Sequence, residues 1–122
     1  MRLRCAMIYA KDMTAMTAFY RDGLGLTPIA ERARDGWLEM DAGGVTVALH
    51  AIPSSIAADI LIASPPAARE DTPIKLIFEV PDLEVARAHL ISHGAQMMDI
   101  RPWGSCDGLD PEGNVFQIAA AS

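Results

Sequence analysis

One pattern of residues occurs twice in this chain, about seventy residues apart, and this internal repeat restricts the folds that the chain can adopt. Asp12 opens one amphipathic helical segment and Asp82 opens another, a spacing of 70 residues (82 − 12). The turn that begins at Asp41 recurs at Asp110, a spacing of 69 residues (110 − 41). Two half-size units that each expose an apolar sheet face must bury it, so the repeat predicts an active cleft between the copies, where matching positions converge.

The order of the predicted elements is the same in both copies. Apolar residues recur at helical spacing after Asp12 and Asp82, and glycines end these segments at Gly23 and Gly94. Apolar runs bounded by turn residues predict the strands. The first copy is expected to contain strand 3–10, helix 13–24 and strands 27–32, 36–41 and 45–50, with Val45 in the core. The second is expected to contain strand 74–80, helix 83–93 and strands 95–100, 103–109 and 114–119, so each copy reads βαβββ.

The two copies are predicted to form a single α+β domain over residues 1–122, because each half alone has only about 50 residues with which to build a core. Repeat 1 covers about residues 1–51 and repeat 2 about residues 74–122. A connecting loop at 52–73 carries proline and serine clusters. Within that loop, residues 56–63 are too apolar for an unattached linker and are expected to pack down as a short helix or an edge strand.

The composition argues against several classes of protein. The net charge of −6 and the pI of about 4.8 argue against nucleic-acid binding, which rewards basic surfaces, and would suit a cationic ligand. No apolar run approaches the roughly 20 residues that span a bilayer. Asp12 interrupts the apolar stretch near the N-terminus, so no signal peptide is expected. The two cysteines, Cys5 and Cys106, make no disulfide framework and favour a reduced, cytoplasmic setting.

Two motifs resemble a known superfamily. Residues 19–26 read Phe-Tyr-Arg-Asp-Gly-Leu-Gly-Leu, residues 110–118 read Asp-Pro-Glu-Gly-Asn-Val-Phe-Gln-Ile, and Trp103-Gly104 precedes the second motif. With these motifs the chain resembles, over nearly its whole length, the vicinal oxygen chelate superfamily of glyoxalase I, bleomycin-resistance proteins and extradiol dioxygenases. The resemblance implies that the two βαβββ repeats form one cup-shaped mixed sheet with helices on the outside, and that the protein is a homodimer.

The resemblance also marks four metal positions. Metal-dependent members carry His or Glu at four matching strand positions, which correspond here to Cys5, Ala48, Lys75 and Gln117. Divalent ions in such cups prefer imidazole and carboxylate, whereas Ala48 offers no donor and Lys75 is cationic. We therefore expect no metal or other cofactor. The alternative is a divalent metal in a distorted site made by Cys5, His50 and Gln117, although His50 lies about 7 Å along the strand from Ala48.

Strand alternation predicts which side chains face the cleft, because neighbouring residues point to opposite faces of a sheet. Aromatic walls with a few polar groups are typical of pockets for flat or apolar molecules, and here Tyr9, Trp37 and Trp103 would supply them. A lysine facing the cleft at Lys75 must be solvated, bind an anion, or pair with a carboxylate such as Glu39 or Glu79. The predicted ligand-binding cleft comprises Cys5, Met7, Tyr9, Trp37, Glu39, His50, Lys75, Glu79, Trp103 and Gln117.

Three functions remain open at this point. The first is a glyoxalase/bleomycin-resistance-like protein that binds an aromatic or cationic small molecule without a metal. The second is a divalent-metal-dependent lyase, isomerase or dioxygenase with a non-standard site. The third is metal-free acid–base catalysis by Glu39, Glu79, His50 or Lys75. The sequence assigns no catalytic residue, so whether the protein is an enzyme is left undecided.

Overall fold

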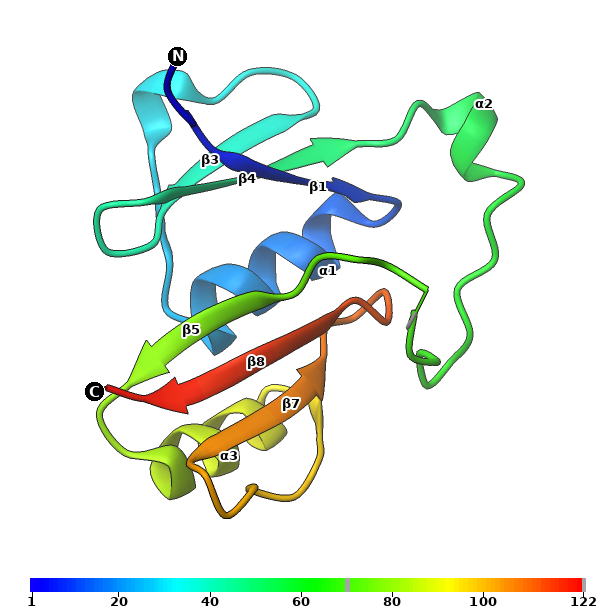
Figure 1. Cartoon of the computed structure of the whole chain (residues 1–122). Coiled ribbons are helices and arrows are strands. Elements are labelled where there is room, and N and C mark those ends of the chain that lie inside the picture. Colours follow the sequence, from blue (N-terminus) through cyan, green and yellow to red (C-terminus); the bar gives the residue numbers. More distant parts are fainter. Residues whose placement is uncertain (70, 122) are drawn as a thin grey trace. The chain divides into compact units, whose positions relative to one another are not determined.

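The computed structural model describes residues 1–69 and 71–121, and the chain divides into two compact units, residues 1–61 and 62–122 (Figure 1). The division falls inside the predicted connecting loop. Each unit contains one βαβββ repeat, so the α+β class and the duplicated topology are confirmed. Among the described residues, no helix has the length and apolar character needed to cross a membrane.

Unit 1 contains a four-stranded sheet in the order β1-β4-β3-β2, with β1 parallel to β4 and the other pairs antiparallel. Figure 1 shows α1 along one face of this sheet. Its elements are β1 (Ala6–Ala10), α1 (Met13–Ala18), the π-helix η1 (Phe19–Gly23), β2 (Thr27–Pro28), the 3-10 helix η2 (Ala30–Arg32), β3 (Trp37–Asp41), β4 (Thr46–Ala51) and α2 (Ser54–Ala57).

Unit 2 repeats the arrangement, with the strand order β5-β8-β7-β6 and β5 parallel to β8. Among the described strands, β1 and β5 each pair with the last strand of their own repeat. Hydrogen bonding therefore makes two four-stranded sheets where the resemblance implied one mixed sheet. The elements of unit 2 are β5 (Leu76–Val80), α3 (Leu83–Ser92), β6 (Gln96–Met97), β7 (Ser105–Leu109) and β8 (Val115–Ala120).

Both long helices begin where the repeat predicts. The Asp12 carboxylate accepts a hydrogen bond from the Ala15 amide at 3.0 Å, and the Asp82 carboxylate accepts one from Val85 at 3.1 Å. A carboxylate at this position satisfies an amide that has no partner within the helix, which fixes the first turn. The predicted helices at 13–24 and 83–93 are confirmed, although the first changes to π-helical geometry at Phe19.

The core of each unit lies between its helix and its sheet. In unit 1 the fully buried side chains include Met16, Met40 and Leu49, and in unit 2 they include Leu90, Phe116, Ile118 and Cys106. The expectation for Val45 was wrong, because this side chain is 68% exposed. The strand β4 begins one residue later, so Val45 belongs to the turn and lies outside the alternating pattern that buries Val47 and Leu49.

Several predicted strands begin two or three residues late, and two others, at 27–32 and 95–100, keep only two strand residues each. The segment 27–32 forms only two strand residues before η2, since Pro28 has no amide to continue the ladder. The segment 95–100 forms only Gln96–Met97 as strand, because Arg87 Nε donates to the Met98 carbonyl at 2.8 Å. The segment 56–63 contributes the end of the short helix α2, with Ala57 buried but Ile56 exposed.

Candidate functional site

The side of the first sheet opposite α1, called here the open face of unit 1, carries a row of three rings. Strand register aligns Tyr9, His50 and Trp37 across β1, β4 and β3. The Tyr9 and His50 rings are stacked with centroids 5.7 Å apart, and the Trp37 ring meets His50 edge-on at 5.4 Å. Tyr9 is 56% exposed. The aromatic row therefore consists of two stacked rings and an indole set edge-on to them, and its Tyr9 end is open to solvent.

The next row on the same face is formed by Met7, Ala48 and Glu39. Met7 is partly exposed, whereas Ala48 and Glu39 are fully buried. Ala48 contributes only a methyl group between its two neighbours. The structure thus brings together five of the side chains predicted to line the cleft in this repeat, which are Met7, Tyr9, Trp37, Glu39 and His50, while the half-buried Cys5 precedes β1.

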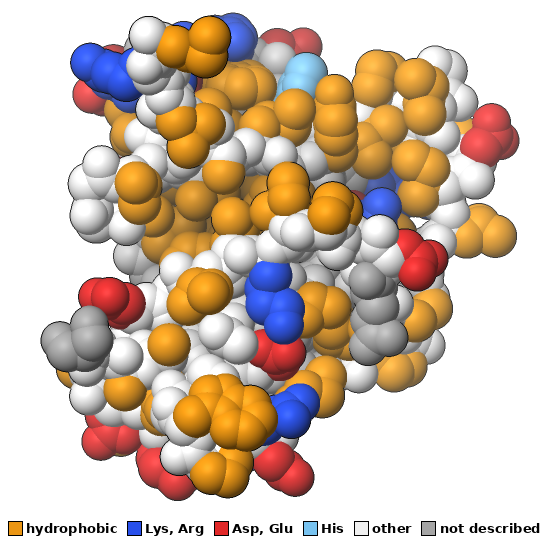
Figure 2. Space-filling model, in the orientation of Figure 1, with side chains coloured by type: hydrophobic (Ala, Val, Ile, Leu, Met, Phe, Trp, Pro, Cys, Tyr) orange, Lys and Arg blue, Asp and Glu red, His pale blue; other side chains and the backbone are white. Residues whose placement is uncertain are grey.

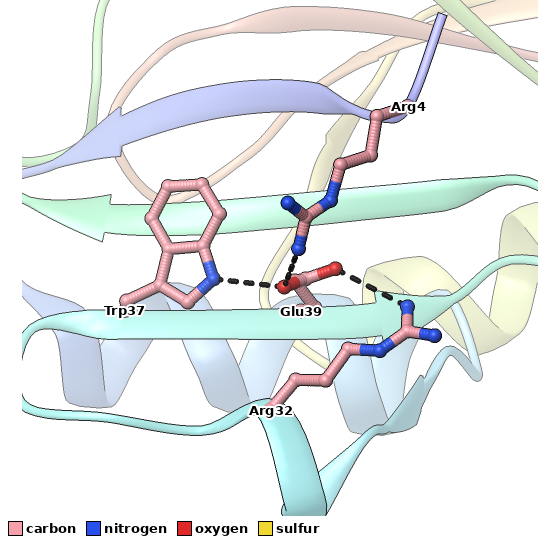
Figure 3. Close-up of polar contacts among 4 residues, drawn as sticks. All are labelled: Arg4, Arg32, Trp37 and Glu39. Carbon is pink, nitrogen blue, oxygen red and sulfur yellow. Dashed lines mark hydrogen bonds and ion pairs between the residues drawn. The ribbon is translucent and has the colours of Figure 1, made fainter.

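Glu39 is a buried carboxylate held by three donors (Figure 3). Trp37 Nε1 donates to Glu39 Oε2 at 3.1 Å, and Arg4 Nη2 donates to the same oxygen at 3.2 Å. Arg32 Nη1 approaches the other oxygen at 3.5 Å. The hydrogen bond from Trp37 lowers the pKa of Glu39 most, burial opposes it, and the charges of Arg4 and Arg32 lower the pKa further. Glu39 is therefore ionised at neutral pH, and it fixes the orientation of the indole.

A third arginine lies against the same indole. The guanidinium carbon of Arg34 stands 4.9 Å from the centre of the Trp37 ring, within the range of a cation–π interaction. The backbones of Arg34 and Trp37 also exchange hydrogen bonds across the turn that joins them, at 2.9 and 3.1 Å. Trp37 is thus held by its indole nitrogen, by its ring face and by its backbone, so its position on the open face is well determined.

The corresponding face of unit 2 is polar. Register aligns Ile77, Gln117 and Asp107 across β5, β8 and β7. Lys75 Nζ lies 2.9 Å from one oxygen of Asp107, and Gln117 Nε2 donates to the other at 3.0 Å. Burial raises the pKa of Asp107, but the hydrogen bonds from Lys75 and Gln117, together with the charges of Lys75 and Arg101, lower it below its ordinary value. In Figure 2, basic and acidic side chains lie side by side over the region of β5 and β8.

Asp107 was missed by the sequence prediction, which offered Glu39 or Glu79 as partners for Lys75. The repeat could have indicated this carboxylate, because Asp107 pairs with Gln117 in the second sheet as Glu39 pairs with Ala48 in the first. Glu79 instead is exposed on β5, in register with Ala119. Each repeat therefore carries a carboxylate opposite the same position of its last strand.

Trp103, which was also predicted to line the cleft, is 73% exposed in the loop before β7, and the Arg101 guanidinium lies 5.5 Å from the centre of its ring.

The four positions that the resemblance marked for metal ligands do not fit a divalent ion. Ala48 has no donor atom, Lys75 Nζ is paired with Asp107, and Gln117 Nε2 donates to the same carboxylate. Within the described part of the chain, no three His, Cys, Asp or Glu side chains gather as a metal site would require. His50 registers with Tyr9, four residues beyond Cys5 and so about 13 Å along the strand. That spacing does not suit one ion, whose bonds to nitrogen or sulfur measure about 2.0–2.3 Å.

One family of proteins and several solved structures match this chain. The family described as "Glyoxalase-like domain" matches residues 5–119. No curated protein matches the sequence. The similar solved structures include a glyoxalase/bleomycin resistance protein/dioxygenase family enzyme from Burkholderia phytofirmans PsJN, with 20% identity, a TM-score of 0.72 and 98% of each chain covered.

Two further structures extend the comparison. A mutant of the fosfomycin resistance protein FosX from Listeria monocytogenes, complexed with Mn(II) and 1S,2S-dihydroxypropylphosphonic acid, is 16% identical with a TM-score of 0.74. The match covers 99% of this chain and 90% of that one. An integron cassette protein of V. cholerae is 20% identical with a TM-score of 0.69, covering 100% and 96%. At these identities the likeness concerns the fold.

Proposed function

Because this chain belongs to the glyoxalase-like domain family, we propose that it binds a small molecule with a flat aromatic ring, without a metal ion. The observation that carries the proposal is the aromatic row of Tyr9, His50 and Trp37 on the open face of unit 1. Aromatic surface exposed beside a few fixed polar groups suits a ligand that stacks on the rings and is oriented by the polar groups.

The fixed orientation of Trp37 supports this use of the row. Its Nε1 is bonded to a fully buried carboxylate, and its ring lies beneath Arg34. A ring that is already immobilised loses little conformational freedom when a ligand stacks on it, and aromatic contacts contribute about 0.5–1.5 kcal/mol beyond the buried area. Tyr9 and His50 then extend the same surface, so a two-ring ligand could contact all three side chains.

The chemistry of the four family positions supports the metal-free part of the proposal. Lys75 and Gln117 are engaged with Asp107, and Ala48 offers no donor. The metal-dependent lyase, isomerase or dioxygenase remains the competing function, and a FosX protein with Mn(II) shares the fold. A titration with and without a chelator separates the two functions.

The test uses Trp37 as its reporter. In a Trp103→Phe background Trp37 is the single tryptophan of the chain. The protein is titrated with 2-naphthol, an uncharged two-ring probe, with and without excess EDTA. We expect saturable quenching that EDTA leaves unchanged, and an affinity about tenfold lower (about 1.4 kcal/mol) after Tyr9→Ala. Ile77→Ala is the matched control, because Ile77 is exposed to a similar extent, 60% against 56% for Tyr9, on the polar face of unit 2.

Two results would overturn the proposal. Equal affinity of the Tyr9→Ala and Ile77→Ala proteins for 2-naphthol would show that the aromatic row does not bind the ligand. Loss of binding in EDTA, restored by Mn(II) or Zn(II), would support the metal-dependent alternative. We also propose that the protein is a homodimer in the cytoplasm, as the resemblance implies, and light scattering after size-exclusion chromatography would measure the oligomeric state directly.

A further inference from the structure

We propose that the ligand of the open face of unit 1 is an aromatic anion, and that Arg4, Arg32 and Arg34 recognise its negative charge. The inference rests on the proposed function and specifies the ligand class. It is opposite to the cationic ligand that the acidic composition would suit. The ring of the ligand would stack on the aromatic row, and its carboxylate or other oxyanion would face the guanidinium groups around Trp37.

The acidic excess of the chain is concentrated in the other unit. Residues 1–61 contain six Lys and Arg and seven Asp and Glu, a net charge of −1 (6 − 7). Residues 62–122 contain four Lys and Arg and nine Asp and Glu, a net charge of −5 (4 − 9). The overall charge of −6 is therefore no guide to the field at the aromatic row, which the nearby side chains determine.

Three guanidinium groups lie around Trp37, and two of them contact the carboxylate of Glu39 in the neighbouring row. Arg4 and Trp37 donate to the same oxygen of Glu39, so the Arg4 guanidinium lies beside the indole edge (Figure 3). Arg32 approaches the other oxygen, and Arg34 covers the indole face at 4.9 Å. The contacts around Trp37 therefore involve three positive charges and one negative charge.

Exposure decides which of these charges a ligand meets. The side chains of Arg4 and Arg32 are 72% and 53% exposed, whereas that of Glu39 is 0% exposed. A cationic ligand would encounter guanidinium groups before it could reach the buried carboxylate. An anion meets exposed donors, because each guanidinium has five N–H groups and Glu39 occupies only one on Arg4 and one on Arg32.

The arrangement also suits the geometry of an oxyanion. Arginine binds carboxylate and phosphate groups through two parallel N–H donors, and the arginines here are already positioned by Glu39 or by the indole. The exposed carboxylates Glu31 and Asp35 flank these arginines along the chain. Among the described residues neither forms an ion pair with them, so the guanidinium donors are not occupied by these neighbours.

The experiment compares three probes that share one ring system. The Trp103→Phe protein is titrated with 2-naphthoate, with uncharged 2-naphthamide and with 2-naphthylmethylammonium, and quenching of Trp37 gives each affinity. We expect 2-naphthoate to bind at least tenfold more tightly than 2-naphthamide and the cation to bind most weakly. Raising NaCl from 50 to 500 mM should weaken 2-naphthoate binding severalfold and leave 2-naphthamide unchanged, because salt screens exposed charges.

Variants locate the charge. Arg34→Gln removes a guanidinium that does not contact Glu39, and we expect it to weaken 2-naphthoate binding three- to tenfold while 2-naphthamide binds as before. Arg21→Gln is the matched control, since it makes the same charge change at an exposed pair with Asp22 in η1. Equal binding of the three probes, tightest binding of the cation, or equal effects of the two variants would overturn the inference while leaving the aromatic site intact. Binding of none of the probes would overturn the proposed function itself.

Discussion

Replacing Gly113 with alanine tests how the turn at 110–114 holds the connecting segment in unit 2. The backbone of Gly113 has φ +83°, and a Cβ atom placed there would overlap the carbonyl oxygen of Ala67. The Gly113 carbonyl also accepts a hydrogen bond from the Arg69 amide at 2.8 Å. The segment therefore approaches the turn so closely that only glycine fits between them.

Gly43 provides a matched control for the size of this effect. It has nearly the same conformation, with φ +80°, but no atom lies within 4 Å of the position that a Cβ would take. Alanine at either site pays the left-handed backbone strain, about 1–2 kcal/mol. At Gly113 the Ala67 carbonyl must also move, which breaks the hydrogen bond from Arg69 at a cost of about 1 kcal/mol and loosens the packing around it. We expect a loss of about 2–4 kcal/mol for Gly113→Ala and about 1–2 kcal/mol for Gly43→Ala, following the same reasoning.

Urea unfolding followed by circular dichroism would measure both losses by linear extrapolation. Hydrogen exchange adds a local readout, because the Arg69 amide should exchange faster in Gly113→Ala and at the wild-type rate in Gly43→Ala. Equal stability losses in the two variants, together with unchanged exchange at Arg69, would refute the close approach of the segment to the turn.

Four further outcomes are expected. Ile118→Ala should destabilise the protein by about 2–5 kcal/mol in urea, because the side chain is fully buried, and a loss below about 1 kcal/mol would contradict its place in the core. Asp107→Asn should lower the free energy of unfolding by about 1–2 kcal/mol, because it weakens a partly exposed ion pair with Lys75 and a hydrogen bond from Gln117. A double-mutant cycle with Lys75→Met that shows no coupling energy would contradict the ion pair. Glu39→Gln should shift the emission of Trp37 by removing the charged acceptor of its Nε1, and an unchanged spectrum would argue against that bond. In the folded state the pKa values of Asp107 and Glu39 are lowered from their ordinary values of 3.8 and 4.5, so both carboxylates stabilise the fold fully above those values. That stability is lost as the pH falls through the folded pKa values. The urea concentration at the unfolding midpoint should therefore decrease when the pH is below about 5, and it should decrease less in Asp107→Asn.

The features that the sequence predicted are those set by nearby residues. The helices start at Asp12 and Asp82 because each carboxylate caps amides three residues away, and this needs no distant partner. Residues alternate between more and less exposed along β1 and β5 because of the pleat of a strand, so the sequence correctly predicted the outward-facing side chains Met7, Tyr9 and Glu79. The duplication then predicted the same topology in both units.

The sequence-based predictions were wrong where a contact with a residue distant in sequence determined a strand end or an ion pair. The strand predicted at 95–100 ends early because Arg87, on α3, takes the Met98 carbonyl. The partner of Lys75 was sought among Glu39 and Glu79, but the structure pairs it with Asp107. These contacts depend on how a helix packs on its sheet and on which strands are neighbours, and neither is encoded in the spacing of residues along one segment.

The sequence alone determined the repeat, the family and the chemistry missing from the metal positions, because each depends on which residues stand at which places in the chain. Only the tertiary structure decided the character of the open face of unit 1. Arg4 and Glu39 are 35 residues apart in sequence, and the fold brings the Arg4 guanidinium to the Glu39 carboxylate, which also accepts a hydrogen bond from Trp37. The charge that a ligand meets depends on which of these groups is buried and which is exposed, and burial is a property of the folded chain.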